Sequence, residues 1–342
     1  MAFIPLTVNR PRRHPEEITI FQYRLAPLAA ALAFAAAPPA LAQADYPNRP
    51  IRVIVPLAPG GGSDYTARFM GIKLAERLGQ QMVVDNRPAS SGIVGTDLVA
   101  KANPDGYTLL LVFSTHAQSA QLWEKLPYDP IKDFAPISLV IQTALALIVH
   151  PSVPAKTVKE FIAYAKANPG KLNFGSSGPG SSPHLATELF NIMTGISGTH
   201  VPYKGIGPVI TAQIGNEIQY SFANMFSTQA HWSSGRLRLI AAGGLKRSEA
   251  YPDVPTIAES GVPGFETLIW YGYMAPAKTP RPIVDRLHKE IVAVVNQPEV
   301  RKQFIAQAND PVANTPQEFT AVIKADAEKW GAIGRKLGVK LD

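Results

Sequence analysis

Three consecutive glycines, Gly60–Gly62, lie between a β-branched run at 51–55 and a helical pattern that extends to Leu78. Glycines at the end of a strand let the backbone turn with its N–H groups unobstructed, and Ser63 or Asp64 can cap the helix that follows. Free N–H donors and a helix N-terminus favour an anionic ligand in front of them. The alternative interpretation is a tight turn that needs glycine for its geometry alone.

A second loop with the same chemistry follows another short predicted strand, within residues 174–185. It contains four serines and three glycines, which supply hydroxyl groups and N–H donors. Ser182 and Pro183 suit the cap and the first turn of the next helix. A flexible glycine–serine loop is the alternative. Because the two loops match, the sequence predicts an anion site to which both contribute.

Motifs for nucleotide and hydrolase chemistry are missing from the sequence. Tyr65 stands where a dinucleotide-binding fingerprint starting at Gly60 needs its third glycine, and there is no Gly-Lys-Ser, Gly-Lys-Thr or Gly-x-Ser-x-Gly motif. The chain has no cysteine, and its histidines do not show zinc-ligand spacing. We therefore expect no metal and no cofactor. His116 and His184 follow predicted strands and are candidate ligand contacts, although structural histidines fit equally well.

Residues 1–42 have the order of a secretory signal peptide. Basic residues precede an alanine-rich apolar run at 25–37, and Ala40–Ala42 provide a small-x-small cleavage site. The apolar run is too short to span a membrane. Without cysteine, a lipoprotein anchor cannot be attached. We expect an exported, unanchored protein, and a periplasm is the location that would confine it.

The charge of the chain argues against nucleic acid as a partner. Residues 1–42 contain four Arg and two Glu, so their removal lowers the net charge from +7 to +5. No cluster of Lys and Arg is interleaved with aromatic residues, as nucleic-acid binding would require. A modest positive charge weakly attracts anions.

Strands and helices alternate along the remaining chain, which favours an α/β fold with mainly parallel sheets covered by helices. We expect two lobes, the first of residues 45–147 plus 270–342 and the second of residues 148–269. The chain is predicted to cross between them at His150–Pro154 and again within 263–275, so that the crossings act as a hinge. Predicted strands are 51–55, 81–85, 108–113, 145–149, 172–175, 218–222, 237–242 and 269–275, and predicted helices are 67–78, 158–167, 186–194, 209–214 and 317–337.

Seven motifs, in order along the chain, carry a resemblance to a known family. They resemble the tripartite tricarboxylate transporter receptors, the Bordetella-uptake-type solute receptors, over essentially all of the chain after residue 42. The motifs are Tyr46–Arg52, Pro56–Asp64, Asp85–Pro88, Pro104–Leu109, Leu126–Pro130, Val201–Gly205, and Asp253–Thr256 with Glu259–Gly261.

The resemblance implies a two-lobed, type II periplasmic binding protein of the Venus flytrap kind. Such a receptor is not an enzyme; it delivers a carboxylated solute to a tripartite tricarboxylate-type membrane permease, with which it docks transiently, and we expect it to be a monomer. The resemblance also implies that a ligand carboxylate lies between the lobes on both loops. The residues expected to bind ligand are Leu57, Pro59, Gly60, Gly61, Gly62, Ser63, Asp64, Ser114, Thr115, His116, Ser176, Ser177, Gly178, Ser181, Ser182, His184, Tyr203, Lys204, Ala223 and Asn224.

One departure from the family pattern bears on the ligand. Many relatives carry Asp where this chain has Ala223, and losing that carboxylate removes an acceptor for a ligand amine or hydroxyl. The prediction is an unaminated mono- or dicarboxylate, with Phe226 and Leu57 able to flank an apolar or aromatic body; ordinary sequence drift is the alternative. Lys204 either pairs with the carboxylate or faces solvent. Tyr271, like Trp232 and Trp270, is expected in the core or hinge.

Two other functions remain open from the sequence. A ligand sensor for a membrane kinase would use the same closed surface as a transport receptor. An exported enzyme acting on a small carboxylate would need an essential acid or base, for which His116 or His184 is the candidate.

Overall fold

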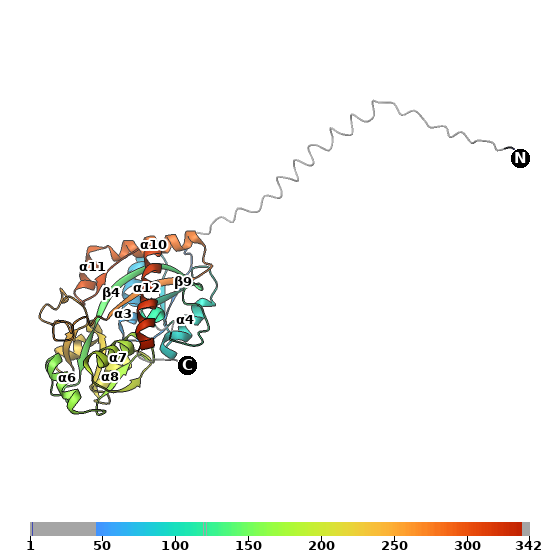
Figure 1. The fold of residues 1–342 in the computed structure, drawn as a ribbon. Coiled ribbons are helices and arrows are strands. Elements are labelled where there is room, and N and C mark those ends of the chain that lie inside the picture. The colour runs from blue at the N-terminus through green and yellow to red at the C-terminus, as the bar shows by residue number, and fades with distance from the viewer. Residues whose placement is uncertain (1, 3–45, 119, 121, 337–342) are drawn as a thin grey trace. The chain divides into compact units, whose positions relative to one another are not determined.

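The computed structural model describes residues 2, 46–118, 120 and 122–336 (Figure 1). The predicted signal peptide, residues 1–42, lies outside the described residues apart from Ala2. The chain from Pro47 onward forms one compact unit.

Helices and strands alternate through the described part of the chain. From Ile51 to Val149 the elements are β1 (Ile51–Val55), α3 (Gly62–Leu78), β2 (Met82–Asn86), the 3-10 turn η1 (Ser90–Gly92), α4 (Ile93–Ala100), β3 (Thr108–Phe113), α5 (Thr115–Gln118) and β4 (Phe134–Val149). They continue with α6 (Val158–Ala167), β5 (Asn173–Ser176), α7 (Ser182–Thr194), β6 (Thr199–Pro202), α8 (Ile206–Ile214), β7 (Tyr220–Asn224), α9 (Met225–Ser233) and β8 (Arg238–Ala242). The last are β9 (Leu268–Pro276), α10 (Arg281–Val295), α11 (Pro298–Ile305), β10 (Asp310–Pro311) and α12 (Pro316–Lys336).

The strands form one sheet in the order β2-β1-β3-β9-β4-β7-β5-β6, and β8 and β10 also pair with β4. Its two ends are parallel, as the alternation predicts: β1 pairs in parallel with β2 and β3, and β5 with β6 and β7. In β1, every residue except Arg52 is fully buried. A continuous apolar strand of this kind is typical of a parallel sheet covered on both faces.

The centre of the sheet is antiparallel, which the sequence did not predict. β4 runs antiparallel to β9 from Phe134 to Ala144, to β7 from Leu145 to Val149 and to β8 from Ala146 to Val149. The register between β4 and β9 shifts near Pro136 and again between Leu139 and Ile141. The first bulge lies next to a proline, which cannot donate to the strand ladder, and the second lies at Val140 within the apolar run.

β4 therefore belongs to two strand groups. The first strand group is β1, β2, β3, β9, β10 and residues 134–144 of β4, and the second is β5, β6, β7, β8 and residues 145–149 of β4. The chain returns at Thr267, whose carbonyl accepts a hydrogen bond from Leu145 N (3.0 Å) just before β9 begins. His150–Pro154, the expected first crossing, lies beyond the end of β4, where His150 N donates to Gln219 O (2.8 Å) inside the second group. The predicted limits of the lobes stay a prediction.

The helices cover this sheet and pack against its apolar clusters, two of which form a core on either strand group. Figure 1 shows α10 and α11 at one end of the compact unit and α6 and α8 at the other, with β4 running between them. Phe319 and Ile323 of α12 pack with Leu110, Val112 and Trp270 in the first core, which confirms the predicted amphipathic helix at 317–337 up to residue 336. The second core gathers around residues 146–148 of β4. Within the described ranges, none of the helices has the length and apolar character that crossing a bilayer requires.

Candidate functional site

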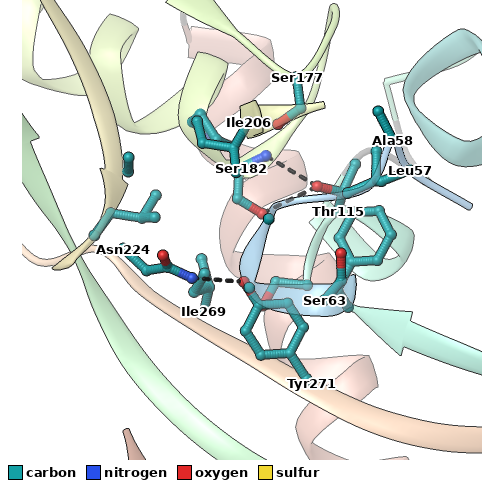
Figure 2. Close-up of a pocket in the computed structure, with 17 residues that line it drawn as sticks. Leu57, Ala58, Ser63, Thr115, Ser177, Ser182, Ile206, Asn224, Ile269 and Tyr271 are labelled. Carbon is teal, nitrogen blue, oxygen red and sulfur yellow. Dashed lines mark hydrogen bonds between the residues drawn. The ribbon is translucent and has the colours of Figure 1, made fainter. Parts of the chain in front are cut away.

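A pocket of about 40 Å³ lies where strand ends meet helix starts, at the junction of the two strand groups (Figure 2). Backbone leaving β1, β3 and β7 meets the N-termini of α3, α7 and α8 there. The pocket is lined by Leu57, Ala58, Gly61, Gly62, Ser63, Phe113, Ser114, Thr115, Leu145, Ser177, Ser182, Pro183, Ile206, Ala223, Asn224, Ile269 and Tyr271.

The first loop, residues 57–63, brings the N-terminus of α3 to this pocket. Gly61 is the N-cap residue of α3 and supplies no side-chain cap. The first N–H groups of an α-helix have no acceptor within the helix, so Gly62 and Ser63 offer donors to the pocket that they line. The N-terminal end of the helix dipole adds a partial positive charge at the same place.

Asp64 organises the first loop and does not line the pocket. Its Oδ2 accepts a hydrogen bond from Gly60 N (3.2 Å) and its Oδ1 accepts one from Arg68 Nε (3.0 Å). Because Arg68 balances its charge, the carboxylate of Asp64 does not set the sign of the pocket.

The other strand group approaches the first loop closely enough to require glycine there. A Cβ atom at Gly61 would lie 2.8 Å from Ile206 Cγ2, and one at Gly62 would overlap with the side-chain nitrogen Nδ2 of Asn224 in β7. The sequence predicted glycine here for its backbone freedom. The structure adds a steric reason, because a side chain at either position would keep the two strand groups apart.

The second loop, residues 176–184, uses most of its polar groups to hold itself. Ser176 Oγ accepts from Gly178 N (3.1 Å) and contacts His200 Nε2 (2.6 Å). Ser181 Oγ caps α7 by accepting from His184 N (3.4 Å). These groups lie behind the pocket and are not part of its lining.

Two stacked imidazoles support the second loop. The rings of His184 and His200 are 4.0 Å apart between centroids, and Phe174 stacks on His200 at 4.9 Å. Burial and the neighbouring His200 lower the pKa of His184 to about 3, and burial lowers the pKa of His200 to about 4. His184 is thus neutral, and its Nδ1 accepts a hydrogen bond from Gly180 N (3.0 Å).

His116 is also buried as a structural histidine. Its Nε2 contacts Pro130 O (2.7 Å), and its ring packs against Tyr128 and Phe134. Burial lowers the pKa of His116 to about 4. Neither His116 nor His184 lines the pocket, so the structure does not bring together an acid or base with the expected anion site.

Hydrogen bonds between the strand groups frame the pocket. Ser182 N donates to Thr115 Oγ1 (3.0 Å), and the two hydroxyl oxygens are 3.1 Å apart (Figure 2). On the opposite side, Asn224 Nδ2 donates to the Tyr271 hydroxyl (3.2 Å). Burial raises the pKa of Tyr271, so its phenol stays protonated. Tyr271 was expected only in the core or hinge, and the structure also places it in the pocket wall.

Some of the residues predicted to bind ligand line the pocket, and others lie outside its lining. Lys204 contributes its carbonyl, which accepts from Ala58 N (3.1 Å), and its side chain is exposed away from the lining. Tyr203 N donates to Ser176 O (2.9 Å). Expected residues that line the pocket are Leu57, Gly61, Gly62, Ser63, Ser114, Thr115, Ser177, Ser182, Ala223 and Asn224; those outside its lining are Pro59, Gly60, Asp64, His116, Ser176, Gly178, Ser181, His184, Tyr203 and Lys204.

Of the two side chains expected to flank the ligand body, Leu57 lines the pocket, whereas Phe226 packs against Tyr65 and is not part of the lining. The other large apolar side chains of the wall were not predicted. Ile206 begins α8, Leu145 lies in β4 and Ile269 in β9, and nothing in their local pattern separates them from core residues. Among the described residues that line the pocket none is charged, and the described chain contains no group of three or more His, Asp or Glu side chains that could hold a metal ion.

A family model described as the tripartite tricarboxylate transporter family receptor matches residues 66–339. The chain belongs to this family. BugT of Bordetella pertussis is 38% identical over 298 residues, which cover 86% of this chain and 91% of BugT.

Solved structures of family relatives have the same fold. The periplasmic binding protein BugD is 32% identical with a TM-score of 0.83, covering 86% of this chain and 99% of BugD. A Rhodopseudomonas palustris protein solved with adipate is 32% identical with a TM-score of 0.84, covering 86% of this chain and 99% of that protein. MatC from the same organism, with bound malate, is 29% identical with a TM-score of 0.80, covering 84% of this chain and 99% of MatC.

These matches confirm the predicted family and the predicted α/β fold of a two-lobed, type II periplasmic binding protein. Receptors of this family are periplasmic solute-binding proteins, and the family is not one of enzymes.

Proposed function

We propose that this protein binds a small organic carboxylate between its two lobes and delivers it to a tripartite tricarboxylate-type permease. The observation that carries the proposal is the N-terminus of α3, which has no side-chain cap and meets a pocket lined from both strand groups. The adipate- and malate-bound relatives support a carboxylate as the anion.

Helix-end and hydrogen-bond energies suffice for this binding without an arginine clamp. A helix N-terminus contributes about 0.3–1 kcal/mol toward an anion, and a hydrogen bond to a charged group about 1.5–3 kcal/mol. Donors at Gly62, Ser63 and Ser177 line the pocket. Several such contacts, less the costs of association and closure, reach the roughly −8 kcal/mol of micromolar affinity.

A ligand in this pocket would stabilise the closed arrangement of the lobes. Contacts already join the two strand groups around it, including Ser91 Oγ donating to Pro179 O (2.7 Å). A carboxylate that touches α3 on one side and the second loop on the other binds the closed state better than an open one, and so shifts the population toward closure. The closed form is the state that we expect a permease to recognise.

The proposed function also includes export to the periplasm. Residues 1–42 act as a cleaved signal peptide, and the mature protein works in the periplasm without a lipid anchor, as a monomer that docks transiently. The lobes extend over residues 45–147 plus 270–342 and over residues 148–269.

Thermal unfolding of residues 43–342 against a panel of small carboxylates tests the function. The panel includes aliphatic and aromatic mono- and dicarboxylates, amino-acid dicarboxylates and citrate-like acids. A ligand at 100 times its Kd adds about 2.7 kcal/mol to stability, which raises Tm by several degrees at this size. We expect at least one carboxylate to raise Tm and to be recovered unchanged. No shift with any carboxylate, or recovery of a transformed compound, would contradict the proposal.

A further inference from the structure

The polar side chains in the pocket wall are largely bonded to one another. Thr115 and Ser182 bond each other, and so do Asn224 and Tyr271. Ser114 Oγ accepts from Trp270 N (2.7 Å). Each of these bonds joins segments far apart in the sequence, so a ligand group that captured one of them would break a contact that holds the pocket together.

One donor set stays open toward the ligand. It consists of the first-turn N–H groups of α3, carried by Gly62 and Ser63, and the hydroxyls of Ser63 and Ser177. Ser63 and Ser177 belong to the two loops that the proposed function places on the same carboxylate. The open donors therefore serve one anionic group.

The rest of the lining is apolar. Leu145, Ile206 and Ile269 come from three different elements, and Leu57, Phe113 and Ala223 add to them. Ile269 and Ile206 are seen on the inner wall in Figure 2. A second carboxylate against these side chains would lose its hydration without gaining a partner, because no cationic side chain is among the described lining residues.

We infer that the pocket selects a monocarboxylate with an apolar body and discriminates against the corresponding dicarboxylate. This inference rests on the proposed function. This preference would distinguish the chain from two relatives whose structures contain the dicarboxylates adipate and malate. Ala223 agrees with this preference, since its methyl group extends the apolar wall.

Matched ligand pairs test the inference on the purified protein by isothermal titration calorimetry at pH 7.5, where both carboxyl groups are ionised. The pairs are butanoate with succinate, hexanoate with adipate, and benzoate with terephthalate. In every pair with measurable binding we expect the monocarboxylate to bind about 100-fold more tightly, corresponding to about 2.8 kcal/mol at 1.4 kcal/mol per tenfold. A dicarboxylate that binds as tightly as its partner, or more tightly, overturns the inference and leaves the proposed function standing. No binding by any of the six overturns the inference, and the wider carboxylate panel then decides the proposed function.

A charge placed on the wall sharpens the result. Ile269→Lys puts a cation where the described lining has none, and Ile269→Met is its neutral control of similar size. We expect Ile269→Lys to lower the ratio of monocarboxylate to dicarboxylate affinity at least about tenfold. Ile269→Met should leave this ratio unchanged. A folded lysine variant with an unchanged preference would contradict the claim that the missing cation sets the selectivity.

Discussion

The two glycine-rich loops resemble each other in composition and differ in what their polar groups do. The first loop places Gly61 at the start of α3 without a side-chain cap. The second loop caps α7 with Ser181 and bonds Ser176 to its own backbone and to His200. The difference indicates that serines and glycines before a helix leave donors for an anion only where the loop does not use them itself, as at Ser63 of the first loop and Ser177 of the second.

The largest effect on carboxylate affinity is expected from a bulky residue in the first loop. Gly61→Val places side-chain atoms where Ile206 Cγ2 would lie 2.8 Å from the new Cβ, so the strand groups cannot close over a ligand. We expect carboxylate affinity to fall at least about 100-fold, while the protein remains folded. Calorimetry with the best carboxylate and thermal unfolding of the free protein measure the two effects.

Gly60→Ala is the matched control in the same loop. Gly60 has a φ of +87°, and a Cβ there meets nothing within 4 Å. The alanine costs about 1 kcal/mol or more of stability through backbone strain, without a steric block to closure. Equal loss of affinity in both variants would mean that loop conformation, and not closure, explains the effect of Gly61→Val.

The second loop predicts a pH effect on stability. In the folded protein, burial and the neighbouring His200 lower the pKa of His184 to about 3, and burial lowers the pKa of His116 and of His200 to about 4, all below the ordinary histidine value of 6.5. As pH falls below 6.5, the unfolded chain binds protons that the folded protein does not, so stability is lost between about pH 6.5 and 4. His184→Gln should reduce this slope by up to about 1.4 kcal/mol per pH unit.

Urea unfolding at half-unit steps from pH 4.5 to 7.5 measures that slope. Asp326 acts in the opposite direction, since burial raises its pKa to about 6 and its proton stabilises the folded state below that pH. His184→Gln with the wild-type slope would show that the imidazole is not held neutral by the loop.

A smaller effect is expected at the cap of α7. Ser181→Ala removes the side chain that accepts from His184 N and should cost about 1 kcal/mol of stability. Because Ser181 does not line the pocket, affinity should change less than about threefold. A loss of affinity as large as that expected for Gly61→Val would show that Ser181 contributes to binding as much as the first loop does.

The smallest effect is expected at Lys204. Its exposed side chain lies outside the pocket lining, so Lys204→Ala should change carboxylate affinity by less than about twofold. Calorimetry at low and high salt measures any contribution; a tenfold loss at low salt would restore Lys204 as a partner of the carboxylate.

The local part of the fold could be predicted from the sequence. The predicted strands at 51–55 and 108–113 and the predicted helix at 158–167 match β1, β3 and α6 to the residue. Their patterns are continuous and carry their own start and stop signals. The first part of β4 was missed because Ser138 and Thr143 interrupt the apolar run. Their hydroxyls donate to Asn314 O and Ala308 O (both 2.7 Å), far along the chain.

The site was predictable to the extent that single loops define it. The residues at the start of α3 line the pocket as the glycine motif indicates. The hydrogen bond between His200 and Ser176 and the one between Asn224 and Tyr271 each join residues from different strands. Both depend on how the strands pair across the sheet. Pairing of this range leaves no local pattern, so the sequence overestimated the second loop and missed the apolar wall.

The sharing of β4 between two strand groups also bears on how the chain folds. Leu145 pairs with the backbone at Thr267, and Ile141 pairs with Pro311 of β10, so the central strand is bordered by segments that are synthesised much later. Contacts between residues so distant in sequence slow folding, because a long loop must close before they form. A nascent chain that ends before β9 therefore exposes both edges of the first part of β4, and the first core cannot be completed until β9 and α12 have been made.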